Sequence, residues 1–175
     1  MTVAVIIPCY RCAAQITNVI NTLPDKVKHI FVVDDACPKQ SGQKANGVHD
    51  TVRVITRETN GGVGAATKTG IRLALELGAD IIVKLDADGQ MSPSLIPDLI
   101  APLKEKRADF CKGTRFDSPE DLEGMPKIRL IGNSALSLVN KFSSGYWSVN
   151  DPTNGFIAMT RAVGEGLSLD KIADD

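Results

Sequence analysis

Two aspartates and a glutamine directly follow an apolar run of the chain. Residues 81–85 have the length and composition of a buried strand, and Asp86, Asp88 and Gln90 come after it. Side chains alternate along an extended chain with period two, so Asp86 and Asp88 can point to one place. Two carboxylates at one place repel unless a cation lies between them, and such oxygen ligands suit Mg²⁺ or Mn²⁺. We interpret Asp86, Asp88 and Gln90 as candidate metal ligands, with an acidic strand-to-helix turn as the alternative.

Residues with other useful chemistry follow the remaining strand-like segments. Pro8 and Tyr10 follow the first, Asp34 and Asp35 the second, Asn60 and Gly62 the third, and Arg115 the fifth. In open α/β sheets, ligands bind outside the carboxyl ends of the strands. Carboxylates accept hydrogen bonds from a base or ribose, aromatic rings pack on bases, glycines permit close approach, and arginines bind phosphate. With a divalent cation, these groups describe a pocket for a nucleoside diphosphate.

The segments that would position these residues alternate between strand-like and helix-like patterns. We expect strands at residues 3–7, 28–33, 53–56, 81–85 and 109–113, and helices at residues 13–23, 63–77, 93–106 and 128–142. Ser92 is expected to cap the third helix, and Pro93 suits its first turn. This alternation predicts an α/β fold with a mainly parallel sheet flanked by helices. Residues 1–175 contain no repeat or linker and are expected to form one domain.

Composition and charge are those of an ordinary globular domain. The 20 Lys and Arg and 21 Asp and Glu give a formal net charge of -1, and the basic residues are scattered, which argues against a nucleic-acid partner. No apolar run approaches the roughly 20 residues that span a bilayer, and the amino terminus does not resemble a signal peptide, so we expect a cytoplasmic protein. The near-zero charge leaves a homo-oligomer open.

The cysteines suggest a second, less favoured interpretation, a redox or zinc site. Cys9 and Cys12 form a C-x-x-C after a strand and before a helix, the setting in which a redox pair is found. A zinc site would need two more ligands, and only Cys37 and two isolated histidines lie near in sequence. Cys111 is more simply a small buried apolar residue.

Six motifs in order carry a resemblance to a known family. They are VIIPCY at residues 5–10, VVDD at 32–35, NGGVG at 60–64, DADGQ at 86–90, KGTRF at 112–116 and DPTNGF at 151–156. In their order and spacing the chain resembles the inverting family 2 glycosyltransferases, especially the polyprenyl-phosphate (dolichyl-phosphate) sugar synthase branch. The resemblance implies a GT-A fold and a Mg²⁺- or Mn²⁺-dependent enzyme. Its donor would be a UDP- or GDP-linked sugar, and its acceptor a lipid phosphate or a hydroxyl, with a polyprenyl phosphate favoured.

The resemblance also implies roles for single residues. Those assigned to the nucleoside are Pro8, Tyr10 and Asp35, supported by Asp34, with Asn60 and Gly62 in the same pocket. Asp86 would meet the ribose or the metal, while Asp88 and Gln90 would ligate the metal that bridges the diphosphate. Residues assigned to phosphate groups of donor or acceptor are Arg115, Arg129 and Asn133, and a solvated helix face is an equal alternative for the last two.

The implied reaction is a direct displacement at the anomeric carbon of the sugar. The metal and Arg115 would stabilise the charge that develops on the leaving nucleoside diphosphate. A lipid phosphate is already anionic and needs no general base, whereas a hydroxyl acceptor must lose a proton to a carboxylate. Asp151 is the candidate for that base, with a structural role in its loop as the alternative.

The chain departs from the family pattern in places. Arg11 and Cys12 stand where an asparagine and an acidic residue are usual, and residues 36–39 replace a small acidic turn. The chain ends at Asp175, before the family's acceptor-side acidic motif, so we expect a fragment truncated at its carboxyl end that lacks any membrane tail of the parent protein.

Two alternative functions remain open on the sequence. The pocket could belong to a noncatalytic nucleotide-sugar-binding module, or to a nucleotidyltransferase, which would release pyrophosphate. Residues 62–69 approach a P-loop, but Thr67 stands where that motif requires glycine. The amphipathic segment at residues 136–147 could contact a lipid acceptor or a membrane surface, and a helix packed on the core is the favoured alternative.

Overall fold

The computed structural model describes residues 1–114, 127–145, 147, 151 and 153–174, with only the backbone described at 127–131 and 133–135. The chain divides into two compact units, Met1–Cys111 with Ile157–Asp175, and Lys112–Phe156. The first unit contains the strands β1 (Val3–Cys9), β2 (His29–Asp34), β3 (Val52–Thr56), β4 (Ile81–Lys84) and β6 (Ile157–Thr160), and the helices α1 (Ile16–Asn21), α2 (Gly62–Glu76), α3 (Ile96–Lys104) and α6 (Arg161–Gly166). Strand β5 (Phe110–Lys112) runs across the boundary, and helix α5 (Lys127–Ser144) belongs to the second unit.

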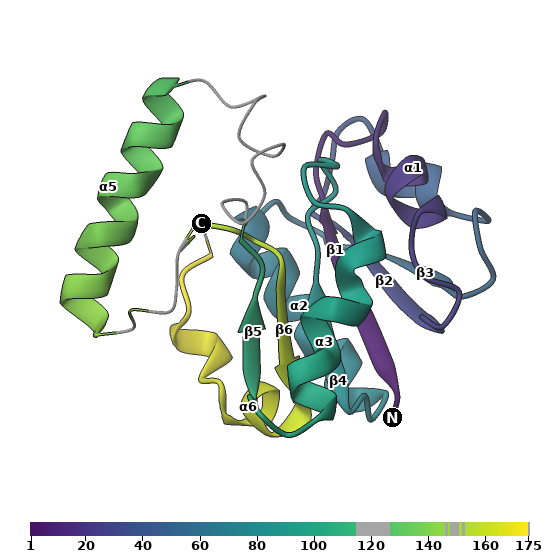
Figure 1. Cartoon of the computed structure of the whole chain (residues 1–175). Helices are drawn as coiled ribbons and strands as arrows, with labels where there is room; N and C mark the ends of the chain where they lie inside the picture. The colour runs from purple at the N-terminus through teal and green to yellow at the C-terminus, as the bar shows by residue number, and fades with distance from the viewer. Residues whose placement is uncertain (115–126, 146, 148–150, 152, 175) are drawn as a thin grey trace. The chain divides into compact units, whose positions relative to one another are not determined.

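The strands form one six-stranded sheet in the order β3-β2-β1-β4-β6-β5 (Figure 1). Strands β1 to β4 run parallel, and β6 is antiparallel to β4. This arrangement confirms the expected α/β fold with a mainly parallel sheet. Strands β2 and β3 lie on one side of β1 and β4 lies on the other, so the strand order reverses between β1 and β4, where open sheets bind their ligands.

Helices cover both faces of this sheet (Figure 1). Helix α2 packs on β1 and β2, and its Ala66, Ile71 and Ala74 join Ile6 and Phe31 in a buried core. Helix α3 packs on β4 and β6 from the other face, where Ile100 and Leu103 are buried. Alternate residues of β1 face opposite sides of the sheet, and helices cover both sides. The strand is therefore apolar throughout and buried almost entirely.

The expected elements are present, with shifted ends. The expected helix at residues 93–106 begins as a 3₁₀ turn, Pro93–Leu95, and continues as α3. The expected cap at Ser92 is wrong, because its hydroxyl bonds the Ser94 hydroxyl and makes no capping hydrogen bond. Our strand list lacked β6, whose four residues pair with β4 across a long sequence separation and show little local pattern.

In the second unit, α5 is an 18-residue helix. Its Leu138, Val139 and Phe142 are more than half exposed, and the Phe142 ring meets the Trp147 ring edge to face. Among the residues that the structure describes, no helix is long and apolar enough to cross a membrane.

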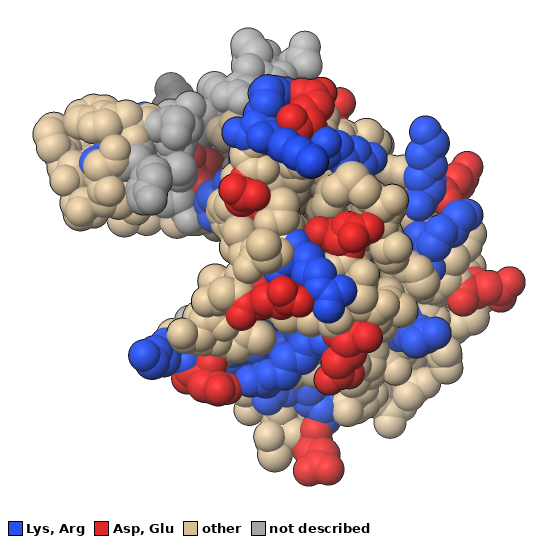
Figure 2. Space-filling model, turned by 90° about the horizontal axis from the view of Figure 1, so that it is seen from below, with Lys and Arg blue, Asp and Glu red and all other residues tan. Residues whose placement is uncertain are grey.

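Acidic and basic side chains intermingle over the face of the molecule that Figure 2 shows. Among the ion pairs of the protein are Arg72 with Asp170 and Arg161 with Glu165. Charged residues are therefore scattered on this face of the molecule, as they are along the sequence.

The close approach of α2 to β1 gives a first testable expectation. A Cβ added at Gly70 would overlap Cγ2 of the buried Ile6. We expect Gly70→Ala to lower the free energy of unfolding by about 2 kcal/mol, because overpacking outweighs the roughly 1 kcal/mol that alanine contributes to a helix. Urea denaturation measures this change. The control is Gly166→Ala, where an added Cβ meets nothing within 4 Å, and equal stability of the two variants would contradict the expectation.

Candidate active site

A cavity of about 330 Å³ lies at the carboxyl ends of the parallel strands, within the first unit. Its volume is in the range of small-molecule sites. It is lined by the end of β1 and the loop after it, by residues that follow β2, β3 and β4, and by the start of α2: Pro8, Cys9, Tyr10, Cys12, Asp35, Asn60, Gly62, Val63, Ala66, Asp86, Ala87 and Asp88. Four of the five strand ends that the sequence singled out therefore contribute to one cavity.

Asp34, at the end of β2, is a buried support of the neighbouring loop. Its side chain is 2% exposed, and its two carboxylate oxygens accept backbone N–H groups from Cys37 at 2.7 Å and Gly42 at 2.6 Å. A Cβ at Gly42 would lie 2.7 Å from the same carboxylate, so the loop closes tightly on it. Asp34 is not among the residues that line the cavity, and the part expected for it in nucleotide binding stays a prediction.

Asp35 lines the cavity, but its charge is already balanced inside the protein. Arg57 lies 3.2 Å from Oδ1, and the N–H groups of Gly61 and Gly62 donate to the carboxylate. The Asn60 amide donates to the Asp35 carbonyl at 3.1 Å, which ties the loop before α2 to the end of β2. These contacts hold Asn60, Gly62 and Asp35 together at one wall of the cavity.

The backbone N–H groups at the start of α2 have protein partners. Gly61 and Gly62 donate to Asp35, and Gly64 and Ala65 donate to the carbonyl oxygen of Asp174. A P-loop offers such groups to phosphate oxygens. The hydrogen bonding here therefore argues against a P-loop, as Thr67 does in the sequence.

Asp86 and Asp88, which follow β4, line the cavity, and Lys84 is the last residue of the strand. The Lys84 ammonium forms an ion pair with Asp86 Oδ1 at 2.5 Å, and both side chains are partly or largely shielded from solvent. Asp88 is exposed, and its Oδ1 accepts the backbone N–H of Gln90 at 3.0 Å. Gly89 has φ +75°, a conformation that favours glycine, and this turn presents Asp88 at the rim. Gln90 is exposed and lies beyond the cavity lining.

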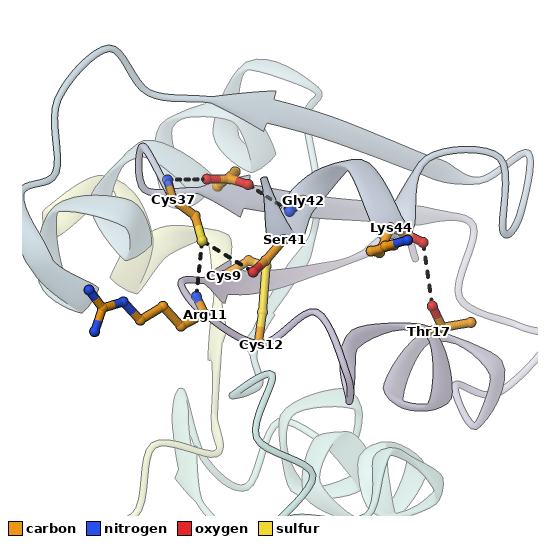
Figure 3. The surroundings of a disulfide bond; sticks show 9 residues. Cys9, Arg11, Cys12, Thr17, Cys37, Ser41, Gly42 and Lys44 are labelled. Carbon is orange, nitrogen blue, oxygen red and sulfur yellow. Dashed lines mark hydrogen bonds between the residues drawn. A yellow bond between two sulfur atoms is a disulfide. The ribbon is translucent and has the colours of Figure 1, made fainter. Parts of the chain in front are cut away.

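The loop after β1 contains a disulfide bond between Cys9 and Cys12 (Figure 3). Tyr10, in the same loop, is half-exposed and lines the cavity, and the Arg11 guanidinium lies 5.2 Å from the ring centroid. The zinc reading does not fit this structure, because the two sulfurs are bonded to each other and are not thiolates. The redox reading stays a minor alternative.

Cys37 is tied to the same loop, because the Arg11 N–H donates to its sulfur at 3.2 Å and the Ser41 hydroxyl lies at the same distance (Figure 3). Burial by itself would raise the pKa of the Cys37 thiol. Hydrogen bonds from Ser41 and from backbone N–H groups, including that of Arg11, together outweigh burial and lower this pKa below its ordinary value.

The remaining predicted site residues belong to the second unit. Asp151 is 1% exposed, accepts a hydrogen bond from the Thr153 hydroxyl at 3.1 Å, and its carbonyl accepts the Asn154 N–H. Arg115 lies outside the described residues, and only the backbone of Arg129 and Asn133 is described, within α5. The roles expected for Arg115, Arg129, Asn133 and Asp151 stay predictions.

Sequence reasoning missed two cations that hold the carboxylates of the cavity, Arg57 and Lys84. Lys84 left a signal, since it is the one charged residue within the apolar run at 81–85. A buried charge needs a partner, so a lone lysine in such a run points to a nearby carboxylate. Arg57 left no comparable signal, because it follows a half-buried edge strand.

The donor groups at the rim fit a divalent cation that also binds a ligand. Among the described residues, no three His, Cys, Asp or Glu side chains gather closely enough to hold a metal by themselves. Mg²⁺ is commonly held by one or two carboxylates together with water and substrate phosphates. The exposed Asp88 carboxylate, next to a cavity of nucleotide size, offers such a partial site.

Comparison with known proteins finds a family model that the chain matches. Residues 4–166 match the family model described as glycosyl transferase family 2. The chain is 32% identical to a UDP-N-acetylglucosamine–dolichyl-phosphate N-acetylglucosaminyltransferase of Methanococcus voltae, over 93% of this chain and 71% of that protein. It is 30% identical to a dolichol-phosphate mannosyltransferase of Pyrococcus furiosus, over 98% of this chain and 50% of that protein. The chain thus spans between half and about seven tenths of these two relatives.

Solved structures agree on the fold. Glucosyl-3-phosphoglycerate synthase from Mycobacterium tuberculosis superposes with a TM-score of 0.71 at 22% identity, covering 93% of this chain and 57% of that one. At this identity the likeness concerns the fold alone.

Proposed function

The chain belongs to glycosyl transferase family 2, in its polyprenyl-phosphate sugar synthase branch, and from this premise we propose that its cavity binds a nucleoside diphosphate sugar for transfer to a polyprenyl phosphate. The observation that carries the proposal is the joint placement of Tyr10, Asp35, Asp86 and Asp88 around one cavity. An aromatic ring can pack against a base, and carboxylates can accept hydrogen bonds from a ribose. An exposed carboxylate can bind the metal that holds a diphosphate.

The residues of the cavity have separate tasks in this proposal. Pro8 and Tyr10 provide the surface on which the base packs, and Asp35, held by Arg57, faces the nucleoside. Asp86 and Asp88 lie where the ribose and the diphosphate would follow. Because Asp35 and Asp86 are fixed by internal cations, they are oriented before a ligand arrives, which reduces the entropy lost on binding.

The transfer forms one bond and breaks one. An oxygen of the acceptor phosphate attacks the anomeric carbon while the bond from that carbon to the diphosphate breaks, and the nucleoside diphosphate leaves with the electron pair. The phosphate oxygen is already anionic, so the chain needs no base for this acceptor. A divalent cation held at Asp88 would stabilise the charge on the leaving diphosphate.

Calorimetric titration tests the donor half of the proposal. UDP, GDP and their sugar conjugates are titrated with Mn²⁺, with Mg²⁺ and with EDTA. We expect one nucleoside diphosphate and its sugar conjugates to bind with the metals and not with EDTA. If none of them binds to a chain that circular dichroism shows to be folded, the proposal is wrong.

The product separates this reaction from the alternatives. With a short-chain polyprenyl phosphate and the donor that binds, we expect release of nucleoside diphosphate and formation of a lipid-linked sugar. Release of pyrophosphate would instead identify a nucleotidyltransferase. Metal-dependent donor binding without product would favour the noncatalytic binding module.

A further inference from the structure

Lys84 is a buried cation in an otherwise apolar strand. It is the last residue of β4, is 8% exposed, and stands in register with Ile6 of β1 and Ile157 of β6. Removing an ammonium group from water is costly unless a partner compensates for it. A position flanked by two isoleucines would ordinarily hold another apolar residue, so the lysine calls for an explanation in terms of the site.

The partner of Lys84 is the first carboxylate of the D-x-D motif. Its ammonium lies 2.5 Å from Asp86 Oδ1, and the two residues point to the same side because they are two apart along an extended chain. The Asp86 side chain remains 32% exposed and lines the cavity. A carboxylate that lines the cavity is thus paired with a buried ammonium group behind it.

The three carboxylates that line the cavity therefore differ in charge balance. Asp35 is balanced by Arg57 and two backbone N–H groups, and Asp86 is balanced by Lys84. Within the described part of the chain, Asp88 accepts only the Gln90 N–H and forms no ion pair. A cation that enters this rim gains more from an unneutralised carboxylate than from one already paired with an ammonium group.

We propose that Lys84 is a positioning residue that keeps Asp86 from the divalent cation and directs it to the hydroxyl groups of the donor, so that Asp88 is the carboxylate that binds the metal. This inference rests on the proposed function, because it assigns Asp86 to the hydroxyl groups of the proposed donor and Asp88 to the metal. It predicts that removing Lys84 increases metal affinity, whereas loss of a merely structural residue would leave metal affinity unchanged or reduce it.

The test is a titration of the whole chain with Mn²⁺ alone, in which electron paramagnetic resonance measures the free ion. In Lys84→Met the long side chain is kept and the charge is lost, so Asp86 becomes a second ligand. We expect Mn²⁺ to bind about tenfold more tightly to this variant. Lys84→Arg keeps the charge and should restore the affinity of the unaltered chain.

The double variant Lys84→Met/Asp86→Asn tests more directly whether Asp86 is a metal ligand. It replaces a neutral ion pair by a neutral pair of side chains, so Mn²⁺ affinity should stay within about threefold of the unaltered chain. Its affinity for the nucleoside diphosphate sugar should nevertheless fall, because the carboxylate that faces the hydroxyl groups is gone. A loss of Mn²⁺ binding in the double variant would overturn the inference, since Asp86 would then be an essential ligand.

Lys68→Met controls for the loss of a positive charge as such. Lys68 is also a shielded lysine, 12% exposed and paired with Asp174, but it lies on α2 and outside the cavity lining. If Lys68→Met tightened Mn²⁺ binding as much as Lys84→Met, or if Lys84→Met had no effect in a folded chain, the inference would be wrong. Because the rim is a partial site, the titration is repeated with the nucleoside diphosphate present, and failure of the unaltered chain to bind Mn²⁺ there would overturn the proposed function, and this inference with it.

Discussion

Asp88→Asn is expected to abolish the metal-dependent part of donor binding while leaving the fold intact. Asp88 is exposed at the rim, so its carboxylate carries little of the folding free energy, and asparagine can still accept the Gln90 N–H. The amide has no charge with which to hold a divalent cation. We expect the affinity for the nucleoside diphosphate in Mn²⁺ to fall by at least about 100-fold, so that the variant, like the unaltered chain in EDTA, shows no binding.

The measurement is a calorimetric titration of the variant with and without Mn²⁺, beside urea denaturation of the same sample. A matched control is Asp98→Asn, which removes one exposed carboxylate in the first turn of α3, away from the cavity lining. It should leave donor binding unchanged. Donor binding by Asp88→Asn that still responds to Mn²⁺ would remove Asp88 from the metal site.

Asp34→Asn is expected to cause a large loss of stability. Both oxygens of Asp34 accept short hydrogen bonds from buried backbone N–H groups, those of Cys37 and Gly42. Asparagine has one carbonyl oxygen, so its amino group would face an N–H group that then lacks an acceptor. Hydrogen bonds to a charged group contribute roughly 1.5–3 kcal/mol each, so we expect the free energy of unfolding to fall by about 3 kcal/mol.

Urea denaturation of Asp34→Asn beside Asp170→Asn measures this difference. Asp170 is also paired, with Arg72, but its side chain is 92% exposed, so its removal should change stability by less than about 0.5 kcal/mol. Equal midpoints for the two variants would mean that the loop after β2 does not depend on Asp34. A further consequence is testable in the same samples: because Asp34 adjoins Asp35, loosening the loop should also weaken donor binding.

Local pattern was sufficient to predict the parallel part of the sheet. Strands β1, β2 and β4 are continuous apolar runs that end in polar residues, and α2 and α3 follow them at helical spacing. Strand β6 was not in the predicted list because an antiparallel strand is stabilised by its partner, here β4, and not by its own four residues. The Ser92 cap failed for a related reason, since a 3₁₀ turn precedes α3 and the hydroxyl meets Ser94.

The sequence alone determined the family, the sheet and the set of residues at the strand ends, because these follow from residue types, order and periodicity. Only the tertiary structure decided how the charges are shared. Arg57 pairs with Asp35, and the Asp35 carboxylate also closes the start of α2, more than 20 residues away. Lys84 is close in sequence to both Asp86 and Asp88, and only the structure shows that Asp86 is its partner. Hydrogen bonds and ion pairs depend on distances in space between side chains, and no spacing along the chain specifies which carboxylate remains free to bind a cation.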